Sequence, residues 1–241
     1  TGANLFIALD ISQSMLAQDT SPSRLGFAIV FAQKLLEELT QFKVALFAFA
    51  FDGYLQMPLS TDVFAAADLL SSMHPSNTTA QGTNLNRTLE KLMGEIIRSE
   101  EITREKGGDW TIPQVLILSD GETHVPMKDE VLAGFRARKI QIFTVVTGRG
   151  EGVSVPTEGK FGQGSENLRD SSGKMVKTAA HPEMLRRISD LTGGHSFDGQ
   201  FNEVGPLAKR LSQAMQFGKL ATTFKLEKEY FPVLFTLALL V

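Results

Sequence analysis

The sequence predicts an α/β protein: a doubly wound, mostly parallel six-stranded sheet with one antiparallel edge strand and helices on both faces. Short apolar runs alternate along the chain with amphipathic helical patterns, as expected for parallel strands joined by crossover helices. The strand segments are apolar over nearly their full length, which is typical of strands covered on both faces. With 241 residues, 42% of them hydrophobic, the chain can form one sizeable core.

The first half of the chain contains three expected strands. The run LFIAL predicts the first, and SPSRLGFAIVFAQKLLEEL, which Ser21 or Ser23 can cap, predicts the helix after it. KVALFAFA predicts the second strand. Asp52-Gly53 then predicts a hairpin into YLQMPL, a third strand antiparallel to the second. Helical patterns follow over residues 62–73 and 84–104.

The second half completes the sheet but contains one interruption. PQVLILS, KIQIFTVV and HSFD predict the remaining strands, with helices expected over residues 127–138, 182–192 and 204–217. Residues 149–178 are rich in Gly, Ser, Glu and Lys and lack a helical period. We expect a hairpin-like insertion there, with a two-strand core around NLRD and KMVK. Such a long loop is either a functional surface or solvated decoration.

The C-terminal segment has a different composition from the rest. After the charged stretch KLEKEY, the chain continues as FPVLFTLALLV, eleven residues without a charge. A membrane-spanning helix needs about 20 apolar residues, so this run resembles the first half of one. We expect a domain over residues 1–220, followed by a juxtamembrane segment and the start of a transmembrane helix over 221–241. A buried terminal helix or strand is the alternative.

Charge and cysteine content exclude several classes of function. The net charge is −3 and basic residues are interspersed with acidic ones, so no nucleic-acid partner is expected. Cysteine is absent, which excludes a disulfide framework, a thiolate metal site and a cysteine nucleophile.

Polar side chains gather at the expected carboxyl ends of the strands. Asp10 ends the first strand and is followed at alternate positions by Ser12 and Ser14, while Asp120 ends the fourth. Thr83 lies in the loop before the long helix. If the first and fourth strands are central neighbours, these residues surround one point at the topological switch of the sheet. Carboxylates and hydroxyls are hard oxygen donors, which suit Mg²⁺ or Mn²⁺ and suit Zn²⁺ poorly.

These three sequence elements resemble a known site. Asp10-x-Ser12-x-Ser14, Gly82-Thr83 and the Ser-Asp-Gly at 119–121 resemble the metal-ion-dependent adhesion site of von Willebrand factor A domains, and the resemblance covers about residues 3–217. The segments DISQSMLAQDTSPSRL, YLQMPLSTD, QGTNL and HPEMLRRISDLTGGHSF are further similar to the bacterial Bat aerotolerance proteins of the BatA and BatB type.

The resemblance implies a role for each residue of the site. Ser12, Ser14 and Thr83 are expected as hydroxyl ligands of Mg²⁺, with Mn²⁺ or Ca²⁺ as substitutes. Asp10 and Asp120 are expected to bind directly or through water. An open position would then accept an acidic group from a partner protein. Gln13 departs from the pattern, because many A domains have Gly there.

The resemblance also implies a setting. The protein is expected in the bacterial inner membrane, held by its C-terminal apolar segment, with the A domain facing the periplasm. Its expected partners are other Bat proteins and a MoxR-type ATPase. No catalytic residue is expected.

Two alternatives remain open. One is a Mg²⁺-dependent phosphoryl-transfer enzyme with Asp10 as nucleophile, although Ser12 cannot act as a carboxylate acid or base and no lysine lies close to either motif in sequence. The other is a scaffold with a vestigial metal site that contacts partners through residues 149–178 or its helical faces. Asp19 and Glu122 are expected as solvated loop acids, and His124 is not expected as a ligand.

Overall fold

The computed structural model describes residues 3–78, 82–150, 152–157 and 166–214. Its main sheet has six strands in the order β3-β2-β1-β4-β5-β8. All neighbouring pairs are parallel except β2 and β3, which form the expected antiparallel hairpin. The predicted fold class is therefore confirmed. The strands are β1 (Ala3–Asp10), β2 (Phe42–Phe49), β3 (Gly53–Ser60), β4 (Gln114–Ser119), β5 (Ile142–Val146) and β8 (Ser196–Phe197).

The two central strands set the position of the candidate site. All residues of β1 and β4 are buried, as expected for strands covered on both faces. The two strands pair in parallel, with Leu9 opposite Leu118, so both end at the same edge of the sheet. β1 continues to Asp10, and Asp120 directly follows β4.

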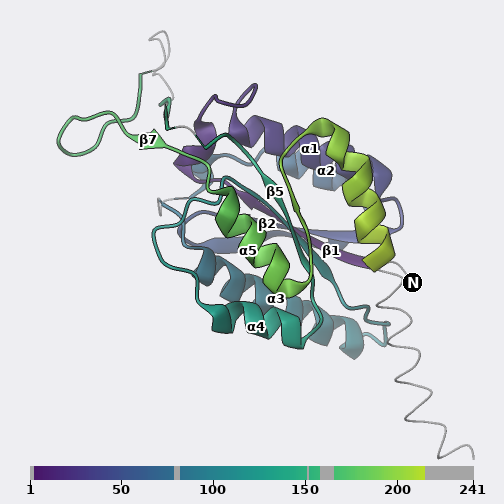
Figure 1. The fold of residues 1–241 in the computed structure, drawn as a ribbon. Coiled ribbons are helices and arrows are strands. Elements are labelled where there is room, and N and C mark those ends of the chain that lie inside the picture. Colours follow the sequence, from purple (N-terminus) through teal and green to yellow (C-terminus); the bar gives the residue numbers. More distant parts are fainter. Residues whose placement is uncertain (1–2, 79–81, 151, 158–165, 215–241) are drawn as a thin grey trace, which may run out of the picture.

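Helices cover both faces of this sheet, as Figure 1 shows. One face packs against α1, α2 and the helical residues 204–214, and the other against α3, α4 and α5. The core therefore consists of two apolar layers separated by the sheet. The helix bounds are α1 (Arg24–Glu38), α2 (Val63–Ser71), α3 (Leu85–Glu105), α4 (Asp129–Ala137) and α5 (Pro182–Thr192).

The insertion is a small hairpin whose regular strands differ from those predicted. β6 (Val153–Ser154) pairs antiparallel with β7 (Lys177–Thr178), and β7 projects from the body in Figure 1. Between NLRD and KMVK there is one isolated bridge, Arg169 with Met175. The predicted two-strand core is shortened by a tight turn. The Asp170 carboxylate accepts backbone N–H groups within this segment, so little chain remains to form a ladder.

The two edges of the sheet are short or irregular. β3 carries an exposed proline, Pro58, and its pairing with β2 contains register shifts. β8 has two residues. In the part of the chain that the structure describes, no helix is long and apolar enough to cross a membrane. The apolar segment 221–241 lies outside the described residues.

Candidate functional site

Two carboxylates occupy the carboxyl ends of the central strands. Asp10 and Asp120 have 0% exposed surface. The fold also fixes the backbone at this edge, because the Asp120 carbonyl accepts the N–H of His181 at 2.6 Å. The topology therefore brings together the two acidic residues that the sequence singled out.

Among the described residues, the Asp10 carboxylate accepts hydrogen bonds from neutral donors only. The Ser12 N–H donates to Oδ1 at 2.9 Å, and the Ser119 hydroxyl donates to Oδ2 at 2.6 Å. Burial, and secondarily the negative charge of Asp120, raise the pKa of Asp10 from 3.8 to about 7. The hydrogen bonds act in the opposite direction without overcoming burial. Asp10 is thus a buried acid whose ionised form lacks a compensating positive charge.

The two serines lie beside these carboxylates. A short 3-10 helix, Gln13–Leu16, begins directly after Ser12 and turns the chain at the end of β1. Within this turn the hydroxyl oxygens of Ser12 and Ser14 lie 2.9 Å apart. A hydrogen bond from Ser14 also lowers the pKa of Asp120, although burial raises it more. Ser14 therefore connects the first segment of the motif to the second carboxylate.

Thr83 joins the same site from a third segment. It is buried, and its carbonyl accepts the N–H of His124 at 3.1 Å, which ties its loop to the loop after β4. The next residue, Asn84, caps α3. A hollow of about 140 Å³ is lined jointly by Ser12, Ser14 and Thr83. We call it the site hollow.

Arg24 lies behind Asp120 as a fully buried cation. It is the first residue of α1 and has 0% exposed surface. Its Nη1 donates to Asp120 Oδ2 at 2.8 Å, while Nε and Nη2 donate to the two oxygens of Asp19, each at 2.9 Å. Gly148 has a φ of +92°, and a Cβ there would overlap Arg24. The guanidinium therefore needs a glycine at this point in the chain.

The prediction that Asp19 and Glu122 are solvated loop acids is wrong. Asp19 binds Arg24 and also accepts the N–H of Arg149, and although burial opposes ionisation, these hydrogen bonds lower the pKa of Asp19. Glu122 accepts a hydrogen bond at 2.5 Å from the hydroxyl of Thr178, which itself accepts one from Arg24. Both acids belong to a network around the site.

The charges of this cluster favour a divalent cation. Four carboxylates, Asp10, Asp19, Asp120 and Glu122, stand against the guanidinium of Arg24, which leaves this network a formal charge of −3 when all are ionised. Among the described residues, no group of three or more His, Asp or Glu side chains is placed to hold a metal ion. A metal here would therefore depend on hydroxyl oxygens as well. Such an all-oxygen donor set fits Mg²⁺, Mn²⁺ or Ca²⁺.

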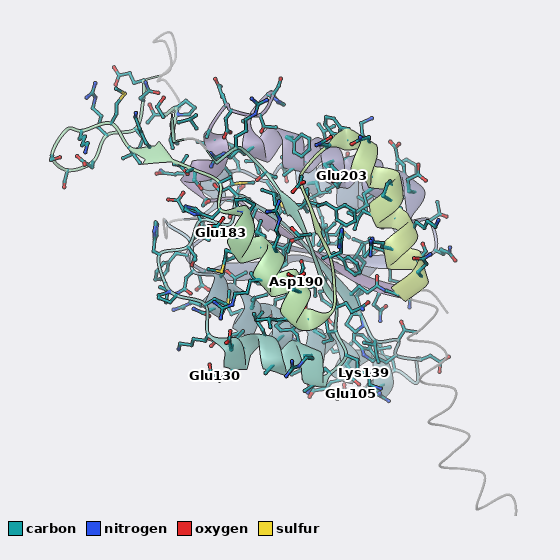
Figure 2. The ribbon with its side chains drawn as sticks, viewed as in Figure 1. Glu105, Glu130, Lys139, Glu183, Asp190 and Glu203 are labelled. Carbon is teal, nitrogen blue, oxygen red and sulfur yellow. The ribbon has the colours of Figure 1, made fainter. Side chains whose placement is uncertain are left out.

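Charged side chains elsewhere lie in a different environment. Figure 2 shows Glu130 on α4 and Glu183 and Asp190 on α5, and all three are exposed to solvent. The carboxylates at the end of β1 and β4 are instead enclosed. Because burying carboxylates costs free energy, this contrast makes the edge of the sheet the candidate functional region.

Comparison with known proteins identifies a family model and relatives that this chain resembles. Residues 5–122 match the family model described as von Willebrand factor type A domain. A curated relative, the "UPF0353 protein" of Mycolicibacterium paratuberculosis, is 27% identical over 202 residues, covering 81% of this chain and 55% of the relative. The chain thus spans about half the length of the curated relatives it matches.

Two solved structures have the same fold. One is an aerotolerance-related membrane protein from Bacteroides fragilis, with a TM-score of 0.75 and 26% identity, covering 88% of this chain and 100% of that one. The other is a conserved hypothetical protein BatB from Bacteroides thetaiotaomicron, with a TM-score of 0.75 and 28% identity, covering 89% and 100%.

Proposed function

We propose that this von Willebrand factor type A domain, similar in structure to BatB, binds an acidic group of a partner protein through a divalent cation, with Mg²⁺ as the first candidate. One observation carries the proposal: a fully buried carboxylate, Asp10, whose described hydrogen bonds come from neutral donors, lies among hydroxyls and next to a second carboxylate. A bound cation would supply the missing positive charge and an electrophilic position for a partner's oxygen.

Hydroxyl and carboxylate side chains would have different roles in binding the ion. Ser12, Ser14 and Thr83 would provide neutral hydroxyl oxygens, which leave the cation electrophilic. Asp10 and Asp120 would provide the negative charge. Ser119 orients Asp10 through its 2.6 Å hydrogen bond, and Arg24 orients Asp120 through its 2.8 Å hydrogen bond. These supporting contacts fix the carboxylates in place before any ion arrives.

The surroundings of Asp10 favour binding over phosphoryl transfer. A nucleophilic carboxylate needs an oxygen that can reach the substrate directly, whereas the Asp10 side chain has 0% exposed surface. Lys177, far away in sequence, does line the site hollow. Hydrolysis of an aryl phosphate is therefore a useful control measurement.

The cellular setting is proposed by analogy. Because one structural match is described as a membrane protein, we propose that this domain, over residues 1–220, belongs to a bacterial inner-membrane protein and faces the periplasm. Residues 221–241 would begin its membrane anchor. Other Bat proteins and a MoxR-type ATPase are the proposed partners.

Calorimetric titration of Mg²⁺ into EDTA-treated protein tests the central proposal. We expect saturable binding by the wild type and a loss of about 100-fold or more in Asp10→Asn. The exposed residue Asp68 on α2 provides the matched control, Asp68→Asn, which should bind like the wild type. Absence of Mg²⁺ and Mn²⁺ binding by the folded wild type would contradict the proposal in favour of a scaffold with a vestigial site. Mg²⁺-dependent hydrolysis of an aryl phosphate that is lost in Asp10→Asn would instead favour the enzyme.

A further inference from the structure

We infer that the insertion forms an apolar subsite beside the cation site, so that the preferred partner group is an acidic side chain next to a branched aliphatic one. This inference rests on the proposed function and adds a specificity element to it. The subsite is the wall of the site hollow formed by Val155, Leu168 and Val176. These residues belong to the insertion and lie more than 70 residues after Thr83 in the sequence.

The site hollow has two chemically different walls. The hydroxyl wall consists of Ser12, Ser14 and Thr83, the hydroxyl residues of the proposed cation site. The aliphatic wall consists of the three aliphatic residues of the insertion, of which Val155 is buried and Leu168 and Val176 are half-buried. A carboxylate bound at the first wall therefore has apolar surface within the same hollow.

The aliphatic wall is held in place by the fold. Leu168 N–H donates to the Val155 carbonyl, and Val176 N–H donates to the Leu168 carbonyl, each at 2.8 Å, so the three residues form neighbouring backbone segments. At the base of the insertion, Thr178 accepts a hydrogen bond from Arg24 and donates one to Glu122. The same network that orients Asp120 thus positions the insertion. A wall fixed in this way loses little conformational freedom when a ligand binds.

The size and charge of the hollow define the occupant. A volume of about 140 Å³ is close to that of a cavity that holds a benzene-sized molecule, so the hollow suits a small carboxylate with one branched aliphatic group. Lys177 also lines the hollow, and its positive charge complements a negatively charged group. A second hollow of about 170 Å³ shares Gln13, Val155 and Leu168 with the first. Two neighbouring hollows that share these residues favour a peptide segment over an isolated small molecule as the natural occupant.

A series of simple carboxylates tests the inference without a known partner. Acetate, butyrate and isovalerate are titrated by NMR into the protein in saturating Mg²⁺ and again in EDTA. We expect Mg²⁺-dependent binding of all three, with isovalerate about tenfold tighter than acetate, because each buried methylene contributes about 0.8 kcal/mol and burial here is partial. The double variant Leu168→Ala, Val176→Ala should bind acetate like the wild type and lose most of the gain for isovalerate.

A control variant and the possible negative results distinguish a failure of the aliphatic subsite from a failure of the cation site. Met175 is exposed and belongs to the same insertion but does not line the site hollow, so Met175→Ala should retain the full gain. Acetate binding in Mg²⁺ with no gain for isovalerate in the wild type would overturn the subsite and leave the cation site standing. The same conclusion would follow if the double variant kept the gain. If no carboxylate binds although Mg²⁺ does, acidic-group recognition fails and the subsite fails with it.

Discussion

The two sides of the candidate site handle buried negative charge in different ways. On the α1 side, Asp19 and Asp120 share one guanidinium, and every nitrogen of Arg24 donates to an oxygen at 2.8–3.2 Å. On the β1 side, the Asp10 carboxylate receives its described hydrogen bonds from a backbone N–H and a hydroxyl. Asp10 ends β1 and Asp120 directly follows β4, which pairs with β1, and both side chains are fully buried.

This difference separates a structural charge from a functional one. A buried carboxylate paired with arginine is compensated by the fold itself, whereas one without a cation raises the energy of the folded state. Arg24 and Asp19 should therefore control stability, Asp10 should control ion binding, and Asp120, which contacts Arg24 and belongs to the proposed ion site, should contribute to both. The following substitutions test that division, beginning with the largest expected effect.

Removing the guanidinium should destabilise the protein most. Arg24→Met leaves Asp19 and Asp120 enclosed without a cation, and breaking a buried ion pair in this way costs about 3–5 kcal/mol of unfolding free energy. Urea unfolding followed by circular dichroism measures the loss. Arg136 is an exposed residue on α4, and Arg136→Met should change the unfolding free energy little. Equal effects of the two substitutions would refute a special role for the α1 side.

Neutralising one carboxylate on each side should have different consequences for the stability of the metal-free protein. Asp19→Asn removes the charged partner of Arg24, and the loss of hydrogen bonds between charged groups costs about 1.5–3 kcal/mol. Asp10→Asn removes an uncompensated buried charge, so the unfolding free energy in EDTA at about pH 8 should be unchanged or higher. Thermal unfolding of both variants gives the comparison. A strong destabilisation by Asp10→Asn would mean that Asp10 has a structural role.

The pH dependence of metal binding should reflect the β1 side. The folded-state pKa of Asp10, about 7, exceeds its ordinary value of 3.8, so the metal-free fold binds a proton that the unfolded chain has lost between these values. The stability contributed by that proton falls as pH rises from about 4 to about 7. Below about pH 7, Mg²⁺ must displace the proton, so its affinity should fall about tenfold per pH unit. Calorimetry at about pH 6 and about pH 8 checks this. An affinity independent of pH would show that Asp10 is ionised throughout.

Much of the fold and part of the site followed from the sequence for a physical reason. Strands covered on both faces are apolar throughout, so β1 and β4 were recognisable as central strands. Once they are neighbours, Asp10 and Asp120 must meet at one edge, and the hydroxyls of Ser12 and Ser14 follow directly along the chain. Their roles as ligands remain predictions.

The supporting network did not follow from the sequence, because it depends on contacts between distant segments. Arg24 lies in the first turn of an amphipathic helix, where an arginine normally faces solvent. Its burial requires Gly148 and Thr178, which are more than 120 residues away in the sequence. Ser119 was noted only as part of the motif around Asp120, yet its hydroxyl binds Asp10 across the strand pair. The strands of the insertion were misplaced because the side chain of Asp170 closes a turn within the predicted ladder.

The edges of the sheet affect how this domain behaves when many copies are crowded together. An exposed strand edge can recruit the same strand of another molecule and begin aggregation. On β3, Pro58 lacks an N–H to offer and the register shifts distort the ladder, while β8 is too short to act as a template. Neither edge therefore provides a regular pairing surface. Association of copies through strand pairing is therefore disfavoured. The loops at the carboxyl ends of the strands remain as the surface on which association can be selective.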